Sequence, residues 1–179
     1  MRKVLYIFGL LTDADVDWMA RAGVRRRVAD GEVLIEEGRA IDSIILLLEG
    51  ELSVVAKGAG EISRLGAGEV VGEMSFVDSA PPSASVIARG TCLALVLGKK
   101  ALTEKLEADT AFGCRFYKAL AIFLADRLRG TVRRFGYGTG SGLAEDAIMS
   151  DELDIGILDN VSMAGARFQR MLGKLMAGR

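Results

Sequence analysis

Glycines punctuate one short stretch that also carries a single acid, and this combination of residues could hold an anion. Residues 65–86 read LGAGEVVGEMSFVDSAPPSASV. Gly66, Gly68 and Gly72 permit backbone angles and close approaches that a side chain would block. A helix that begins near Glu73 would direct free N–H groups at a bound anion. The stretch therefore predicts a binding loop, with a tight surface turn as the alternative.

The sequence contains no histidine, and this excludes several kinds of catalytic site. Histidine-ligated metal sites and Ser-His-Asp or Cys-His catalysis all need that residue. Apart from Glu73, no acid is placed for acid–base work. We therefore expect a protein that is not an enzyme and has no metal site. Cys92 and Cys114 lie in apolar surroundings, which predicts buried, reduced thiols.

Length and composition indicate a globular protein. The chain has 179 residues, of which 26% are charged, with a formal net charge of −1. That balance gives no attraction to nucleic acid or to an anionic membrane. The N-terminus has a brief apolar run, but it lacks a cleavage site and is too short to span a bilayer. We expect a cytoplasmic protein that binds neither DNA nor a membrane.

A helix and then a series of short strands are expected before residue 98. Thr12–Ala22 predicts a helix that Thr12 or Asp13 can cap, with Trp18 in packing. Glycines then separate apolar runs at regular spacing, which favours a closed or double-sheet antiparallel roll, a jelly roll, over residues 24–98. The expected strands are Val24–Val28, Val33–Ile35, Ser43–Glu49, Leu52–Ala56, Ile62–Leu65, Ala84–Ala88 and Thr91–Leu97.

After the strands, the apolar period becomes helical. Lys99–Ala108 predicts one helix, and Thr110–Phe135 a longer one with Thr110 as its cap. The longer helix has two apolar stripes, so it needs two partners. One stripe would pack on the roll. The other would contact a second subunit in a homodimer formed through the 110–135 helix, or the tail of the same chain.

The rest of the chain changes character. Gly136–Gly142 is typical of a linker, and Ser141–Asn160 is acidic and could lie across the basic long helix. Val161–Arg179 predicts an amphipathic helix that docks on its own domain or on a dimer mate. We therefore divide the chain into a domain over 1–136 and a tail over 137–179.

Taken together, these features resemble the cyclic-nucleotide-binding domain family, which includes bacterial catabolite activators and regulatory subunits of protein kinase A. The resemblance rests on the Asp30-Gly31-Glu32 and Glu37-Gly38 turns, on Gly50, on LGAGEVVGEMSF and on the return strand SASV. It implies an eight-stranded β-roll preceded by one helix and followed by two. The opening stretch then corresponds to the phosphate-binding cassette of the family.

The resemblance assigns ligand-binding roles within the cassette. Glu73 would accept the ribose hydroxyl of cyclic AMP or cyclic GMP, and Gly72 would leave room for the sugar. Backbone amides of Met74, Ser75 and Phe76 would face the phosphate. Ser83 would donate to the ligand, followed by the small residue Ala84. Alternatively, Ser83 is an ordinary strand residue, and Glu73 caps its helix or pairs with an arginine.

One position departs from the family pattern. The phosphate-binding arginine immediately precedes the serine in the family, and here that position is Pro82. Proline has neither a guanidinium group nor a backbone donor. We therefore expect weak or absent binding of cyclic AMP or cyclic GMP, unless an arginine of the long helix, Arg115 or Arg127, replaces the missing group.

Two functions follow as hypotheses. The first is a non-enzymatic regulatory sensor in which a ligand in the roll shifts the long helix. The second is a ligand-free roll that serves as a dimerisation or protein-interaction module. A transcription factor of the same family would need a helix-turn-helix region, for which the tail offers only one convincing helix.

Overall fold

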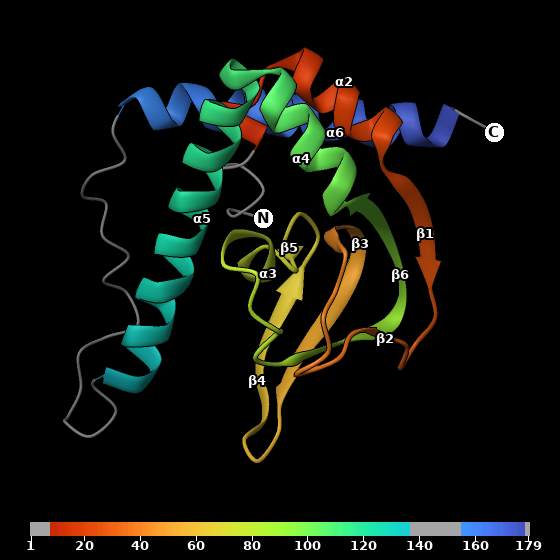
Figure 1. Cartoon of the computed structure of the whole chain (residues 1–179), viewed down its shortest axis with the longest axis vertical. Helices are drawn as coiled ribbons and strands as arrows, with labels where there is room; N and C mark the ends of the chain where they lie inside the picture. The colour runs from red at the N-terminus through yellow and green to blue at the C-terminus, as the bar shows by residue number, and fades with distance from the viewer. Residues whose placement is uncertain (1–7, 137–154, 178–179) are drawn as a thin grey trace.

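The strands form one antiparallel sheet that curls into a roll. The computed structural model describes residues 8–136 and 155–177. Its sheet has the strand order β1-β6-β3-β4, with β2 paired to β6 and β5 paired to β3. Figure 1 shows the roll below a layer of helices. The strands are β1 (Val24–Val28), β2 (Val33–Ile35), β3 (Ser43–Ala56), β4 (Gly60–Gly66), β5 (Val70–Val71) and β6 (Ser85–Gly98).

The expected antiparallel roll is confirmed, but the residues that the structure describes form six strands where the resemblance implied eight. The two pairs of runs predicted on either side of Gly50 and Gly90 are single strands, β3 and β6, with 14 residues each. The register between β3 and β6 shifts near Glu49. Gly50, with φ of 97°, lets the strand continue through this bulge.

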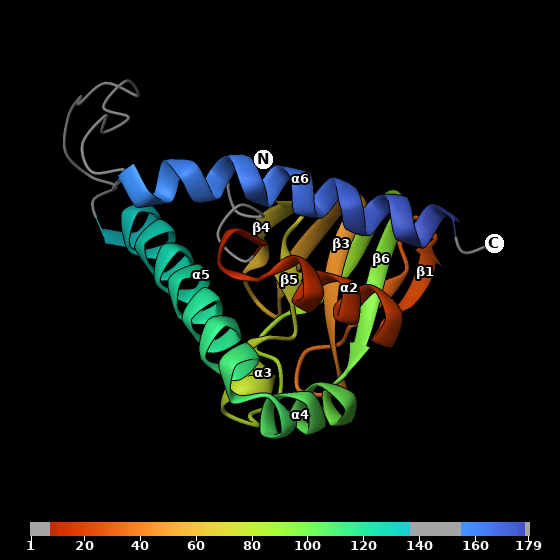
Figure 2. The same cartoon turned by 90° about the horizontal axis from the view of Figure 1, so that it is seen from above.

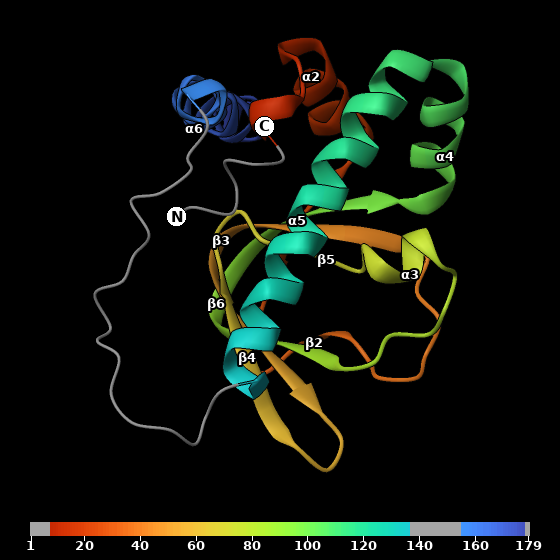
Figure 3. The same ribbon diagram turned by 90° about the vertical axis from the view of Figure 1, so that its left-hand side faces the viewer.

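Two helices follow the roll, where the helical period predicts them. They are α4 (Lys99–Ala108) and α5 (Thr110–Gly136). The expected cap of α5 is wrong, because Asp109 Oδ1 accepts a hydrogen bond from the backbone N–H of Phe112 at 2.9 Å. Figure 3 shows α5 leaving the helical layer and descending along the roll.

The N-terminal helix α2 (Asp13–Ala22) begins at a capping box. Thr12 accepts a hydrogen bond from the Asp15 N–H, while the Asp15 carboxylate accepts one from the Thr12 N–H. Trp18 packs edge-on against Phe112 of α5, with ring centroids 5.5 Å apart, which confirms its expected packing role.

The tail helix α6 (Ile155–Ala177) begins earlier than its apolar period predicts, and it docks on the same chain. Figure 2 shows α6 running alongside α2. Ala164 and Met171 are fully buried there, and Phe168 packs on Phe8 with ring centroids 5.6 Å apart. The expected linker and most of the acidic segment lie outside the described residues, and the domain division at residue 136 stays a prediction.

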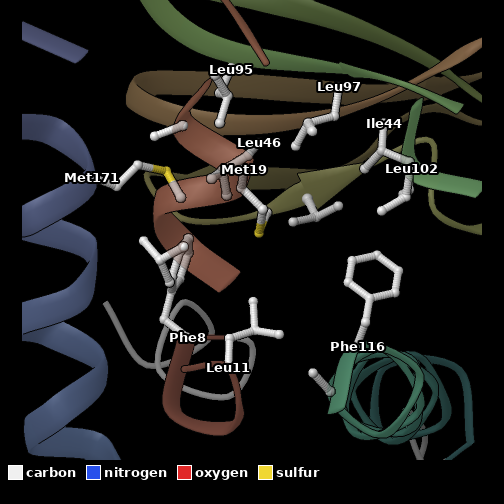
Figure 4. Packing of buried hydrophobic residues seen from close by; sticks show 14 of the residues in the cluster. Phe8, Leu11, Met19, Ile44, Leu46, Leu95, Leu97, Leu102, Phe116 and Met171 are labelled. Carbon is white, nitrogen blue, oxygen red and sulfur yellow. The ribbon is translucent and has the colours of Figure 1, made fainter. Parts of the chain in front are cut away.

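Over residues 8–136 and 155–177, the buried apolar residues form two clusters, one on each face of the sheet. Between the sheet and the helices, side chains from α2, α5 and α6 meet Leu46, Leu95 and Leu97 (Figure 4). A second cluster fills the inside of the roll with residues such as Ile45 and Leu47. Cys92 belongs to this second cluster, but Cys114 is exposed, contrary to expectation.

Candidate functional site

A cavity of about 220 Å³ opens between the inside of the roll and the predicted cassette. Its walls are mainly apolar side chains of the strands. The polar groups come from the cassette and from α5. The lining residues are Ile35, Val54, Leu65, Val71, Gly72, Glu73, Met74, Ser75, Asp78, Ala80, Pro81, Pro82, Ser83, Ala84, Val86 and Arg127.

Gly72 leads the chain from β5 into the cassette helix α3 (Met74–Val77). Its φ of 85° lies in the left-handed region that favours glycine. A Cβ atom at this position would lie 2.8 Å from both Ser43 O and Ile41 Cδ1. The fold therefore requires glycine at residue 72 independently of any ligand.

Glu73 is the buried acid of the cavity, with only 2% of its surface exposed. Its side chain does not cap α3. Instead, Glu73 Oε1 accepts a hydrogen bond from Arg127 Nη1 of α5 at 2.5 Å. Of the alternatives left open by the sequence, the arginine pair is the one the structure contains. This ion pair joins the cassette directly to the long helix.

Burial raises the pKa of Glu73 above its ordinary value, although Arg127 acts in the opposite direction. The guanidinium is itself held by several groups. It donates to Val70 O at 2.8 Å and to Glu69 Oε2 at 3.3 Å, and it lies 4.4 Å from the centre of the Phe123 ring. Arg127 is therefore fixed at the cavity wall and already has anionic partners there.

The cassette helix offers fewer free amides than the sequence predicts. The Phe76 N–H donates to Glu73 O at 3.1 Å, and the Phe76 ring packs on Phe116 of α5, outside the cavity lining. Met74 and Ser75 do line the cavity. Lys99 Nζ donates to Ser75 O at 2.7 Å and so ties α3 to the start of α4.

The return segment brings Pro82, Ser83 and Ala84 to the cavity, as the resemblance implies. Pro82 O accepts a hydrogen bond from the Gly38 N–H at 2.8 Å, which holds this segment against the β2 turn. Ser85 Oγ accepts one from the Glu37 N–H at 3.0 Å and is therefore a structural residue. The assignment of ligand contacts to Gly72, Glu73 and Ser83 stays a prediction.

The two arginines named as replacements for the missing cation have different positions. Arg127 lines the cavity, whereas Arg115 forms a bidentate pair with Asp15 of α2 at 2.8 and 2.9 Å. Arg89 pairs with Glu61 and does not line the cavity. Sequence reasoning missed Glu69 as a partner of Arg127, because a helix-to-loop contact 58 residues apart leaves no local pattern.

Within the described residues, no group of three or more acids or cysteines could hold a metal ion. None of the helices described there is long and apolar enough to cross a membrane.

Comparison with known proteins identifies the roll. Residues 25–109 match the family model of the cyclic nucleotide-binding domain. The cAMP-dependent protein kinase regulatory subunit of Mucor circinelloides f. lusitanicus is 31% identical over 80 residues, which are 43% of this chain and 19% of the relative. The chain thus spans only about a fifth of the length of this curated relative.

Solved structures give the same result. A cyclic nucleotide-binding domain from Methylobacillus flagellatus superposes with a TM-score of 0.69 at 26% identity, over 79% of this chain and 85% of that one. The catabolite activator protein of Thermus thermophilus, at 20% identity, shares the fold with a TM-score of 0.60 over 96% of this chain and 86% of that one. Residues 25–109, which include nearly all of the β-roll, are therefore similar to the cyclic nucleotide-binding domain family.

Proposed function

We propose that this protein is a regulatory sensor in which a small ligand in the roll changes the position of α5. The observation that carries the proposal is the ion pair between Glu73 of the cassette and Arg127 of α5. Any ligand that engages either partner competes with this pair. Occupancy of the cavity is thereby linked to the helix.

The arrangement of charges supports a ligand that competes with the Glu73–Arg127 ion pair, rather than one that binds beside an intact pair. Pro82 supplies no cation, and Arg127 is the cation that lines the cavity among the described residues. An anion would draw the Arg127 guanidinium away from Glu73, whereas a ligand hydroxyl would take over the Glu73 carboxylate. Both events favour an arrangement of α5 without the Glu73 contact, which is the differential binding that a switch needs.

Titration with nucleotides tests the proposal. We expect cyclic AMP or cyclic GMP to bind weakly, because removing the cation of a phosphate site costs about 3–5 kcal/mol. Isothermal titration up to millimolar ligand measures the binding. Fluorescence of Trp18, which packs on Phe112 of α5, measures the response of the helix.

Arg127 should control the position of α5 if the protein is a sensor. An Arg127→Met variant should change Trp18 fluorescence without ligand, and should leave no ligand-dependent change. Arg129→Met, an exposed position two residues further along α5, is the matched control. Binding heat with an unchanged Trp18 signal would contradict the sensor, and absence of heat for a folded sample would contradict the nucleotide as its ligand.

A second candidate is a ligand-free interaction module, which Pro82 and the occupied Glu73 carboxylate favour. If the cavity lacks only the phosphate-binding arginine, a Pro82→Arg variant should bind cyclic AMP more tightly than a Pro82→Met control. If neither variant binds cyclic AMP, the cavity does not bind this nucleotide, and the hypothesis of a ligand-free interaction module gains support.

A further inference from the structure

Three aspartates of α2 contact two different helices. Asp15 faces α5, where it forms the bidentate pair with Arg115. Asp13 and Asp17 face α6, where they pair with its basic residues. The helix α2 therefore lies between α5 and α6 and holds both by charged groups.

The contact between α2 and α5 is bidentate, and its α2 side is buried. Asp15 is 3% exposed, and its carboxylate accepts hydrogen bonds from Arg115 and from the Thr12 N–H. Burial alone would raise the pKa of Asp15, but these hydrogen bonds outweigh it and leave the pKa lowered. Beside the pair, Trp18 packs on Phe112. A displacement of this part of α5 must therefore move α2 or break a buried, charge-assisted contact.

The contact between α2 and α6 combines apolar burial with exposed ion pairs. Arg167 donates to Asp13 at 2.8 Å and also to the carbonyl oxygens of Phe8 and Gly9. Arg170 reaches both Asp13 and Asp17, and Lys174 lies 2.5 Å from Asp17. Exposed pairs of this kind contribute little to stability.

Asp13 and Asp17, which bind α6, are on the same helix as Asp15, which binds α5. A movement of α2 therefore changes the contacts that hold α6. The ion pairs between α2 and α6 are more exposed than the Asp15–Arg115 pair, whereas Ala164 and Met171 of α6 are fully buried. These solvated pairs are therefore the contacts of α6 that a movement of α2 breaks most easily.

One helix joins the cavity to this arrangement. Arg127, at the cavity, and Arg115, at α2, are both on α5, twelve residues or about 18 Å apart along the axis. Because a continuous helix is stiff over this length, a shift at Arg127 is transmitted to Arg115. The ion pairs thus connect the cavity to α6 through α5 and α2.

We propose that α6 is the output element of the sensor: release of Arg127 from Glu73 displaces α5, shifts α2 through Asp15–Arg115, and loosens α6 from α2. This inference deepens the proposed function and rests on it for the ligand that releases Arg127. Loosening α6 would uncover the acidic residues Asp13 and Asp17 and the basic face of α6 together.

Hydrogen exchange of the full chain without ligand tests this connection. We expect Arg127→Met to accelerate exchange of the α6 amides over residues 163–176 by about tenfold, within the usual range of coupling between sites. Exchange of the β3 amides serves as the internal reference for global loosening. The control is Arg129→Met, which has the same change of side chain at an exposed position of α5.

A second variant distinguishes coupling through α5 and α2 from destabilisation of the whole fold. Arg115→Met should also accelerate exchange in α6, and adding Arg127→Met to it should have little further effect, since both lie on one route. If Arg127→Met destabilises the whole fold, Glu73→Gln provides a milder way to weaken the same pair.

Two results would overturn the proposal. One is α6 exchange in Arg127→Met and Glu73→Gln that equals the Arg129→Met control. The other is full additivity of Arg115→Met and Arg127→Met. Either result leaves the ligand response of Trp18 intact as a test of the sensor, so failure of the α6 output is distinguishable from failure of the proposed function.

Discussion

Gly72 is assigned to ligand binding by the resemblance, but it also has a structural role in the cassette. Its positive φ and the 2.8 Å approach to Ser43 O act together against any side chain. The fold would therefore keep this glycine even without a ligand. A glycine at this position therefore indicates the conformation of the loop, and does not by itself indicate that a ligand binds there.

A Gly72→Ala substitution should reduce the free energy of unfolding by about 3 kcal/mol, the sum of a left-handed backbone and an overpacked Cβ. Gly58→Ala is the matched control. Its φ of 82° is similar, but no atom lies within 4 Å of the added Cβ, so we expect about 1 kcal/mol. Urea denaturation measures both, and equal losses would show that the Ser43 contact does not matter.

At the scale of elements, α5 has one covered face and one exposed face. Phe112, Phe116 and Phe123 are buried against the roll and its neighbours. Tyr117, Leu128 and Val132 are exposed by 51%, 64% and 53%. Because α6 packs along α2, it does not cover these side chains, and α6 is not the second partner that this stripe needs.

We predict that the exposed stripe of α5 forms a homodimer contact. Sedimentation at micromolar concentration should give the mass of a dimer, and Leu128→Glu should give a monomer, because a charge would be buried without a partner. Lys118→Glu, at an exposed polar position of the same helix, should leave the dimer intact. A monomeric wild-type protein would contradict the prediction.

The elements were largely predictable because their signals are local. Thr12 at the helix start and the change of period at Gly98 gave helices close to those observed. Gly50 and Gly90 predict strand ends where the structure has bulges, because a glycine in a bulge and a glycine in a turn look alike in sequence. The Glu73–Arg127 pair was only one of several alternatives, since contacts 54 residues apart depend on how the helix packs.

At the scale of the whole molecule, α6 shares the cluster of buried apolar residues with α2, α5 and the sheet. Met171 of α6 is fully buried in that cluster. A helix integrated in this way contributes to the stability of the entire fold, and the global unfolding transition should include it.

Met171→Ala should therefore lower the free energy of unfolding by about 2 kcal/mol, through lost burial and the cavity left behind. Met176→Ala, at a half-exposed position of the same helix, should cost less than about 0.5 kcal/mol. Urea curves from Trp18 fluorescence and far-ultraviolet circular dichroism should coincide. Separate transitions would show that α6 unfolds as an independent unit.

The long pairing of β3 with β6 has a consequence for how fast the protein folds. Ser43 pairs with Gly98, and Val55 pairs with Ser85, so the central ladder joins residues 55 and 30 positions apart. Such non-local contacts form only after the intervening chain has lost much of its freedom. Refolding of the roll should therefore take milliseconds to seconds, slower than is typical of a helical bundle of the same stability, and the cassette is enclosed within the loop that must close.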